Sequence, residues 1–225
     1  MKSLLILLTL VSMGANAFSV DSLFKVDSGK DNYLLLKNTT GRTEFVNIRL
    51  SHLSIKKGEV IEKPFKTEEF MNWPVYSTPS SVILDPGGAE RISLVRMKND
   101  NEQDMLIGVS LLPDTLSSFN NSVDISVGYK SWYLVPGQST MTGQLIAKQS
   151  AGYLLLDNDT NKHLSISIDG CGNKEFSNQD CTLKLFLLSG MSKEIPISTL
   201  KGKGRKINIR YYDALKKTVK DIAVS

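Results

Sequence analysis

Two histidines, one serine and lysine pair and two cysteines are the residues of this 225-residue chain best suited to chemistry. Ser54 and Lys57 have the S-x-x-K spacing that lets a lysine activate a serine across one helical turn. The pair follows a strand-like segment and lacks the companion motifs, so chance explains it better. His52 and His163 each lie beside alternating apolar residues and have no obvious partner carboxylate, which favours a structural role.

The motifs of common enzyme families are also missing from the sequence. It contains no G-x-S-x-G elbow, no H-E-x-x-H pair and no glycine-rich phosphate loop. We therefore expect no enzymatic activity, no cofactor and no metal ion.

The first 17 residues have the features of a secretory signal peptide. Lys2 gives a positive start, Leu4 to Val11 is a short apolar run, and Ala15 to Ala17 supplies small residues at a cleavage site. No later stretch approaches the roughly 18 uncharged apolar residues of a membrane-spanning helix. We expect export, a mature chain that begins near Phe18, and no membrane insertion.

Export changes the interpretation of the two cysteines. Cys171 and Cys181 are close in the sequence, and in an oxidising compartment such a pair predicts a disulfide that closes a short loop. A zinc pair is the alternative, but it would need further ligands, and neither histidine stands in a metal-binding spacing.

The chain shows strand-like segments separated by turn signals, which predicts an all-β fold of two immunoglobulin-like sandwich domains. We expect one domain at 18–136, a linker at 137–143 and a second domain at 144–225. The last segment, 211–225, could form either a helix or a hairpin that turns near Leu215, and we favour the hairpin. The expected strands are Tyr33 to Asn38, Phe45 to Ser54, Arg91 to Met97, Met105 to Leu111, Asn120 to Val135, Leu145 to Ala147, Gly152 to Asn158, His163 to Ile168, Thr182 to Leu187, Lys206 to Tyr212 and Lys220 to Val224.

The segment from Asn120 to Gly137 alternates apolar and polar residues for about twice the usual strand length of roughly five or six residues. Part of its apolar face is therefore available for something besides the protein's own core. We assign Trp132 to Val135 to the internal core and the domain junction, with Gly128 as a bend. The remaining apolar positions of this face are Val123, Ile125, Val127 and Tyr129.

The net charge gives little indication of an anionic partner. The formal charge is +4, and this count includes Lys2, which the signal peptide would remove. The basic run from Lys201 to Lys206 is followed only by Tyr211 and Tyr212 as stacking platforms, so we expect no nucleic acid partner.

Several stretches, in this order, resemble the periplasmic pilus chaperone family, the PapD-like proteins. They are "YLLLKNTTGRTEFVNIRLSHLS", "TPSSVILDPGGAERISLVRM", the long strand that ends in "SWYLVPG", and "GYLLLDNDTNKHLSIS". The cysteine pair is similar to the non-archetypal branches of the family, such as the class 5 or alternative pilus chaperones.

The resemblance implies two immunoglobulin-like domains set at an angle and a periplasmic location. It implies that the long strand lends alternate apolar side chains to a pilin subunit that lacks its own final strand, and that an outer-membrane usher receives the complex. Under this interpretation Val123, Ile125, Val127 and Tyr129 form the donor strand. A self-capping dimer of the free protein is a further implication.

The chain departs from the archetype at its charged positions. The family anchors the subunit's terminal carboxylate with two cations, for which Lys25 and Lys130 are the candidates here, although neither matches the pattern cleanly. Val135 replaces the charged residue before Pro136, which predicts a more apolar domain junction. Two other functions stay open, a secreted two-domain adhesin or pilus structural subunit and an exported enzyme with an unfamiliar site.

Overall fold

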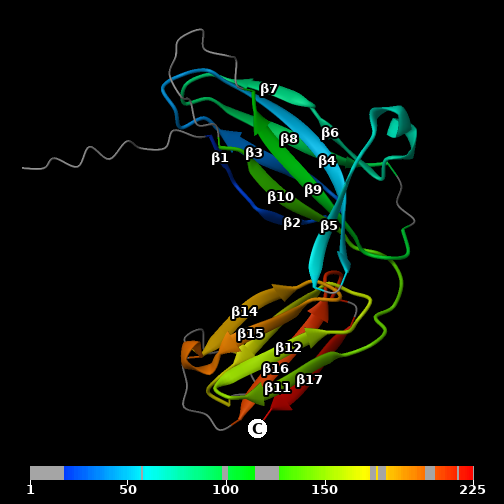
Figure 1. Ribbon diagram of the computed structural model, residues 1–225, viewed down its shortest axis with the longest axis vertical. Coiled ribbons are helices and arrows are strands. Elements are labelled where there is room, and N and C mark those ends of the chain that lie inside the picture. The colour runs from blue at the N-terminus through cyan, green and yellow to red at the C-terminus, as the bar shows by residue number, and fades with distance from the viewer. Residues whose placement is uncertain are drawn as a thin grey trace, which may run out of the picture.

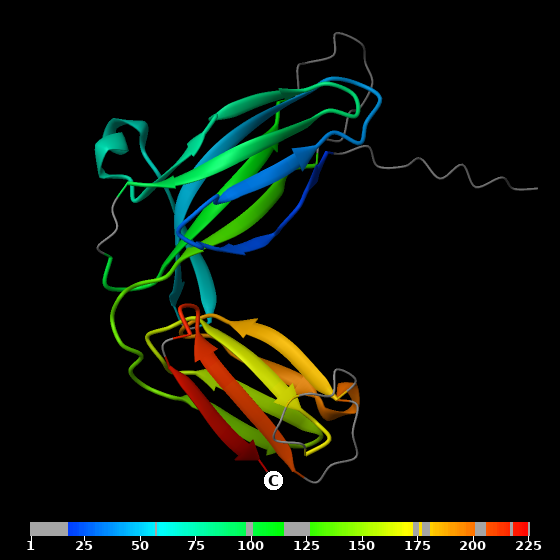
Figure 2. The same cartoon turned by 180° about the vertical axis from the view of Figure 1, so that it is seen from behind.

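The structure, a computed structural model, describes residues 18–56, 58–97, 101–114, 127–172, 176, 181–200, 206–216 and 218–224. These residues form two β-sandwiches, one from each half of the chain, whose strands slope in different directions in Figure 1. Figure 2 shows the same two units from behind, joined by the segment that follows β10 (Tyr129–Val135).

The first sandwich pairs a four-stranded sheet, in the order β1-β3-β8-β6, with a six-stranded sheet, in the order β2-β10-β9-β4-β5, in which β7 also pairs with β4. The strands are β1 (Ser19–Val20), β2 (Phe24–Val26), β3 (Tyr33–Lys37), β4 (Glu44–Lys56), β5 (Glu59–Pro64), β6 (Val75–Thr78), β7 (Ser81–Leu84), β8 (Ala89–Arg96) and β9 (Met105–Pro113), with the 3-10 helix η1 (Thr67–Asn72) between β5 and β6.

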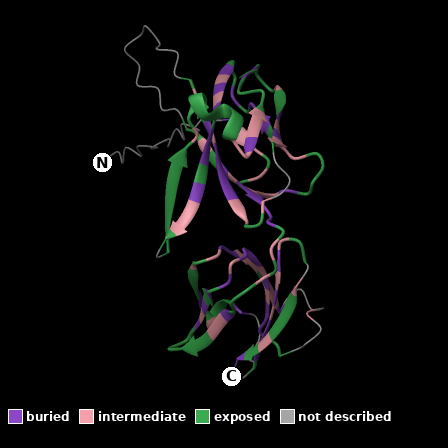
Figure 3. Cartoon of the chain, turned by 90° about the vertical axis from the view of Figure 1, so that its right-hand side faces the viewer, coloured by how far each residue is buried: buried purple, intermediate pink, exposed green. Residues whose placement is uncertain are grey.

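Alternation of apolar residues decides which face of each strand is buried. In β3, Leu34 and Leu36 are fully buried while Leu35 between them is exposed, because successive side chains point to opposite faces of a sheet. Figure 3 shows the same alternation as buried bands on the strands, and shows η1 as exposed. The core of this sandwich contains Phe18, Leu34, Leu36, Val46, Ile48, Leu50, Val75, Val82, Leu84, Ile92, Leu94, Ile107, Val109, Leu111, Tyr133 and Val135.

The second sandwich pairs a three-stranded sheet, in the order β11-β12-β15, with a four-stranded sheet, in the order β14-β13-β16-β17. Its elements are β11 (Leu145–Ser150), β12 (Tyr153–Asn158), β13 (Leu164–Asp169), β14 (Thr182–Leu187), β15 (Ser192–Pro196), the 3-10 helix η2 (Ile197–Thr199), β16 (Ile207–Asp213) and β17 (Val219–Val224). Its separate core is built on Leu154, Leu156, Leu164, Ile166, Ile168, Ile207, Ile209 and Tyr211.

The prediction of an all-β sandwich fold is confirmed. The C-terminal segment forms the hairpin of β16 and β17 rather than a helix, and the described part of the chain contains no helix that is long and apolar enough to cross a membrane. The strands missing from the expected set are β1, β2, β5, β6, β7 and β15, which are short or carry many charged residues. A disulfide joins Cys171 to Cys181, ten residues apart, so these thiols are not zinc ligands here.

A buried asparagine closes the same turn in both sandwiches. In the first, the side-chain amide of Asn38 donates to the backbone oxygens of Arg42 and Leu84, both at 2.8 Å. Its side-chain oxygen accepts from the backbone N–H and the hydroxyl of Thr40, also at 2.8 Å. All the polar groups of this buried side chain are therefore satisfied, which burial requires.

The second sandwich repeats the arrangement after β12. Asn158 donates to the backbone oxygens of Lys162 and Leu187, at 2.9 and 3.1 Å, and accepts from the backbone N–H and hydroxyl of Thr160. In each case the asparagine ties its own turn to a distant strand end, so the two N-x-T turns are equivalent anchors of their sandwiches.

Replacement of Asn158 by Ala would remove the side-chain donor to the Leu187 and Lys162 oxygens and the acceptor of the buried Thr160 N–H, and only the Lys162 oxygen would keep another side-chain donor, the Thr160 hydroxyl. We expect Asn158→Ala to lower the free energy of unfolding by about 2–3 kcal/mol. Chemical denaturation measures the loss. Asp159→Ala, one residue away and exposed, is the matched control and should change stability by less than about 0.5 kcal/mol. Equal effects of the two substitutions would contradict the anchoring role.

Candidate functional site

One edge of β10 is only partly covered. On one side β10 pairs with β9 along its full length, from Tyr129 opposite Leu111 to Val135 opposite Met105. On the other side the parallel strand β2 covers only Trp132 to Leu134. Within the described residues no strand pairs with 129–131 on that side, so this part of the sheet edge is open.

The direction of the backbone groups follows from two hydrogen bonds to the neighbouring chain. The N–H of Trp132 donates to the oxygen of Leu23 at 2.9 Å, and the N–H of Asp27 donates to the oxygen of Leu134 at 2.8 Å. Even-numbered residues of β10 therefore direct their backbone groups away from β9. By the same alternation, the N–H and C=O of Lys130 face the open edge.

The odd-numbered side chains of β10 enter the first core. Ser131, Tyr133 and Val135 are buried, and the ring of Tyr129 packs edge-on against Phe18 with centroids 5.2 Å apart. Of the predicted donor residues, Tyr129 is therefore already engaged by the protein's own core.

Val127 lies two residues before β10 and is 40% exposed. It is two residues from Tyr129 and so has the same place in the strand alternation. Gly128 between them marks the point where the pairing with β9 ends. Val123 and Ile125 lie outside the described residues. The described part of the site is thus an exposed valine followed by an open strand edge.

The two candidate anchor lysines lie on opposite faces of the six-stranded sheet. Lys25 of β2 is opposite the buried Tyr133 in register, and its ammonium donates to the backbone oxygen of Tyr33. Lys130 has the opposite parity to Tyr133 and forms an ion pair with Glu62 of β5. The structure does not bring these lysines together.

The Glu62 carboxylate is tuned by that contact. Hydrogen bonds from Lys130 and then from Ser51 lower the pKa of Glu62 from its usual value. Both partners of the ion pair are more than a third exposed, so the pair contributes little to stability. It does mean that Lys130 already has a carboxylate partner.

The even-numbered side chains of β10 enter a second apolar cluster. Leu134 is fully buried against Leu53, Leu106 and Leu188, and Trp132 packs on the same cluster. Leu188 follows β14 in the second sandwich, so this cluster joins the two units. The assignment of Trp132 to Val135 to the core and the junction is confirmed.

A buried charged group lies at the same junction. Asp104, just before β9, accepts from the Lys162 ammonium at 3.1 Å, from the His163 backbone N–H at 3.0 Å and from the Gly137 N–H at 2.8 Å. The His163 ring nitrogen Nδ1 lies 3.1 Å from the same carboxylate. The Lys162 ammonium also donates to the Gly137 oxygen at 2.8 Å.

This group corrects two predictions from the sequence. His163 does have a partner carboxylate, and the junction is apolar only in part, because Asp104 and Lys162 are almost completely buried there. The missed partners are separated by 58 and 59 residues, and no local pattern relates them. The one available signal was that Lys162 follows the second N-x-T turn as Arg42 follows the first.

The environment of Asp104 determines its protonation. Burial raises the pKa of this carboxyl, but hydrogen bonds from the side chain and backbone of His163, from Gly137 and from Lys162 outweigh it and hold the pKa at about 2. The carboxylate therefore remains charged at any physiological pH and fixes the segment between the sandwiches to both of them.

Comparison with known proteins gives a family and a fold. The sequence model of the family described as "CS5 fimbrial protein N-terminal domain" matches residues 20–136. An Escherichia coli protein described as a 25.9 kDa protein in the CS5 3′ region is 29% identical over 187 residues, which are 81% of this chain and 82% of that protein.

Solved structures share the fold at low sequence identity. The class 5 fimbriae chaperone CfaA is 15% identical, with a TM-score of 0.56 over 92% of this chain and 99% of that chain. The CsuC–CsuE chaperone–tip subunit complex of Acinetobacter baumannii pili contains a chain that is 14% identical, with a TM-score of 0.51 over 82% of this chain and 92% of that chain.

The Asp104 group predicts a pH-dependent stability. Asp104→Asn would leave the buried Lys162 ammonium without its carboxylate, and we expect a loss of about 3–5 kcal/mol at pH 7. In the wild type the pKa is depressed on folding, so the stabilisation is complete above the unfolded value of 3.8 and is lost as pH falls toward about 2.

The difference between wild type and Asp104→Asn should therefore narrow by about 2 kcal/mol between pH 5 and pH 2. Urea denaturation at a series of pH values measures it, with the exposed Asp159→Asn as a control that should follow the wild type. A difference that stays constant over this range would show that the Asp104 carboxylate is not the titrating group.

Proposed function

Because the chain belongs to the family of the CS5 fimbrial protein N-terminal domain, we propose that it is a non-enzymatic periplasmic chaperone of pilus assembly. It binds pilin subunits by β-strand addition, prevents their aggregation and delivers them to an outer-membrane usher. The single observation that carries the proposal is the open edge of β10 beside an exposed valine.

The physical mechanism is pairing of an extended subunit segment with this edge. The outward backbone groups of Lys130 would supply hydrogen bonds that require no particular partner sequence. Side chains at alternate positions before β10 would fill successive apolar pockets of the subunit, each contributing about 1.5–3 kcal/mol before ordering costs. The proposed donor residues are Val123, Ile125 and Val127, and Tyr129, the fourth predicted donor, lies at the boundary because its ring packs against Phe18.

The position of Tyr129 supports a division of labour along the strand. Its ring already contacts Phe18 in the protein's own core, so it marks the point where the internal use of the strand begins. Val127, which is exposed, belongs to the part offered to the subunit. One strand thereby serves two sandwiches in two molecules.

The complete first sandwich favours a chaperone over a pilus structural subunit. A subunit that accepts a donor strand lacks its own final strand, whereas here β10 supplies Tyr133 and Val135 to the core. The solved structures of similar fold include "Crystal Structure of Class 5 Fimbriae Chaperone CfaA" and a chaperone–tip adhesin complex. They support the same choice by analogy of fold.

The proposal extends to processing and organisation. Removal of the signal peptide at 1–17 would release the protein into the periplasm, with domains at 18–136 and 144–225 and a linker at 137–143. When no subunit is bound, a second copy could cover the same open edge, so a self-capping dimer of the free protein is part of the proposal.

Val127→Asp tests the donor strand. A charge at this position would enter an apolar subunit pocket without a partner, which is strongly unfavourable. We expect loss of the 1:1 complex with a pilin subunit in native mass spectrometry of protein recovered from the periplasm of its own host. The side chain is exposed in the free protein, so thermal stability should be unchanged.

Ile83→Asp is the matched control. Ile83 is 61% exposed on β7 of the same sandwich, away from the edge of β10, and its replacement should leave capture intact. Normal capture by folded Val127→Asp would refute donation by this strand. Loss of capture in both variants would point to a general effect of surface charge.

The ion pair of Lys130 tests the anchor assignment. If Lys130 binds the terminal carboxylate of the subunit, Glu62 competes with that carboxylate. Glu62→Gln should then tighten capture about two- to fivefold, the value of an exposed ion pair, and Lys130→Met should weaken it by about tenfold or more. Subunit titration by calorimetry measures both. If Lys25→Met weakens capture and neither of the other variants changes it, Lys25 is the anchor.

A further inference from the structure

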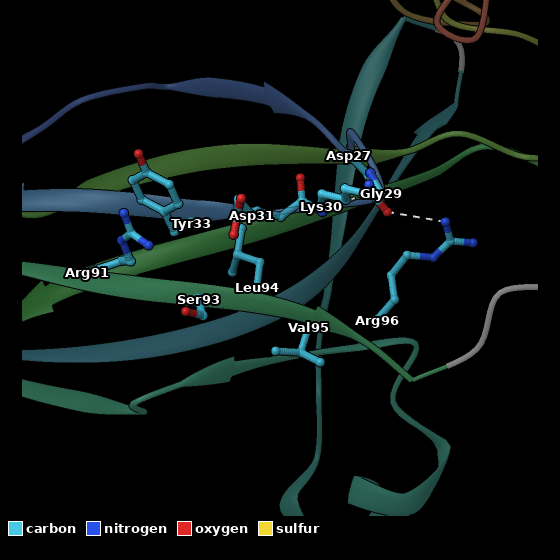
Figure 4. Close-up of a pocket in the computed structure, with 11 residues that line it drawn as sticks. Asp27, Gly29, Lys30, Asp31, Tyr33, Arg91, Ser93, Leu94, Val95 and Arg96 are labelled. Carbon is cyan, nitrogen blue, oxygen red and sulfur yellow. Dashed lines mark hydrogen bonds and ion pairs between the residues drawn. The ribbon is translucent and has the colours of Figure 1, made fainter.

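A polar pocket of about 410 Å³ lies where the loop between β2 and β3 meets β8. Figure 4 shows its lining, with Tyr33 and Arg91 at one end and the ion pair of Asp27 and Arg96 at the other. Lys30 and Asp31 lie between the two ends. The volume is in the range of small-ligand sites, which is roughly 300–1,000 Å³.

The Tyr33 ring at one end of this pocket contacts two cations, of which Arg91 lines the pocket and Lys25 does not. The guanidinium carbon of Arg91 lies 3.8 Å from the ring centroid, and the Lys25 ammonium lies 4.5 Å from it. A stacked guanidinium has a fixed orientation while its N–H edge stays available for a planar or tetrahedral oxyanion. Arg91 is therefore oriented in advance, which lowers the entropy cost of binding.

Arg91, Lys30 and the neighbouring Lys25 have no carboxylate partner in the part of the chain that the structure describes. The ion pairs there do not include Lys25, Lys30 or Arg91. The one carboxylate of the pocket outside an ion pair is that of Asp31. Among the lining residues outside that ion pair, the two cations Lys30 and Arg91 against the one carboxylate of Asp31 leave an excess of positive charge that an anionic ligand would neutralise.

The loop that forms one wall is rigidly organised. The Asp27 carboxylate accepts from the Gly29 N–H at 2.7 Å and from the Asn32 side-chain amide at 2.5 Å. The backbone oxygen of Asn32 in turn accepts from the N–H of Leu94 in β8 at 2.7 Å. Gly29 and Asp31 have positive φ values, of 77° and 48°, so the turn has a specific backbone shape.

The charged residues at the far end of the pocket, Asp27 and Arg96, bind each other and form a wall of the pocket. Arg96 is bound on one side to Asp27 at 3.2 Å and on the other to the Asn101 side chain at 2.6 Å. Asp27 is buried and its charge is neutralised by Arg96. Selectivity for charge must therefore come from the end that carries Arg91.

We propose that this pocket binds a ligand carrying a carboxylate or phosphate group, with Arg91 as the bidentate donor and Lys30 as a supporting cation. The oxyanion is carried either by a small organic anion or by an acidic side chain of an extended peptide. The lining of the pocket includes neither Val127 nor residues 129–131 of the open edge, so the two sites can be tested with different variants.

The test is a titration of the isotope-labelled exported protein followed by amide chemical shifts. The probes are inorganic phosphate, glutarate, and the peptide acetyl-Gly-Glu-Gly-Glu-Gly-amide with its glutamine counterpart. We expect saturable shifts confined to residues 29–33 and 91–96. Saturation by glutarate or phosphate alone would identify a small anion as the source, and saturation by the glutamate peptide but not the glutamine peptide would identify an acidic segment.

Three variants separate a built site from general attraction by charge. Arg91→Met, which keeps an apolar stem over the Tyr33 ring, should weaken binding by about tenfold or more. Asp31→Asn, which tolerates the positive φ, should tighten it severalfold. Lys37→Met, exposed at the end of β3 outside the pocket, should leave the affinity unchanged.

The proposal is overturned if no probe gives saturable shifts at these residues. It is also overturned if Arg91→Met and Lys37→Met weaken binding equally while both remain folded, because the attraction would then reflect net charge alone.

Discussion

The alternation of side chains along β10 is the constraint on which the rest of the structure depends. Successive residues of a strand face opposite sides of the sheet, and here both sides are buried. Tyr133 and Val135 complete the first core, while Trp132 and Leu134 join the two sandwiches. A shift of one residue in register would exchange the two sets and disrupt both clusters at once, so the strand is held in a single alignment at this end.

The charged group at the junction fixes the relative orientation of the two sandwiches, which the apolar contact between them does not specify. Hydrophobic contact between Leu134 and Leu188 favours closeness but no specific orientation. The Asp104 carboxylate accepts from the Gly137 and His163 backbones and from Lys162, which come from the connecting segment and the second sandwich. Because each acceptor site is filled by a directional bond, the carboxylate fixes how the second sandwich follows β10, and burial without these bonds would be unfavourable.

The sequence predicted what depends on local pattern. Alternation in Tyr33 to Lys37 or Leu164 to Asp169 identifies strands because one face is apolar, and the turn residues between them fix their ends. The charged hairpin strand β5 was missed because its side chains are all exposed. The Asp104 group and the contact between Arg91 and Tyr33 were missed for another reason, which is that they join residues far apart in the sequence. Asp104 lies 58 and 59 positions from Lys162 and His163, and Tyr33 lies 58 positions from Arg91. Only the pairing of whole strands brings such residues together, and the local periodicity of apolar residues does not predict which strands pair.

The open edge of β10 is short and lies beside a charged side chain, and both features restrict what can pair with it. An uncovered edge is a site of unwanted pairing between molecules, and in the described residues it is kept short. β2 covers it from Trp132 onward, and Lys130 places a charge beside the uncovered backbone, held by Glu62. A partner strand paired only with 129–131 would gain few hydrogen bonds. Stable pairing must therefore extend toward Val127 and the residues before it, where apolar and polar residues alternate in the sequence. The edge thus favours a partner that has matching apolar pockets over one that lacks them.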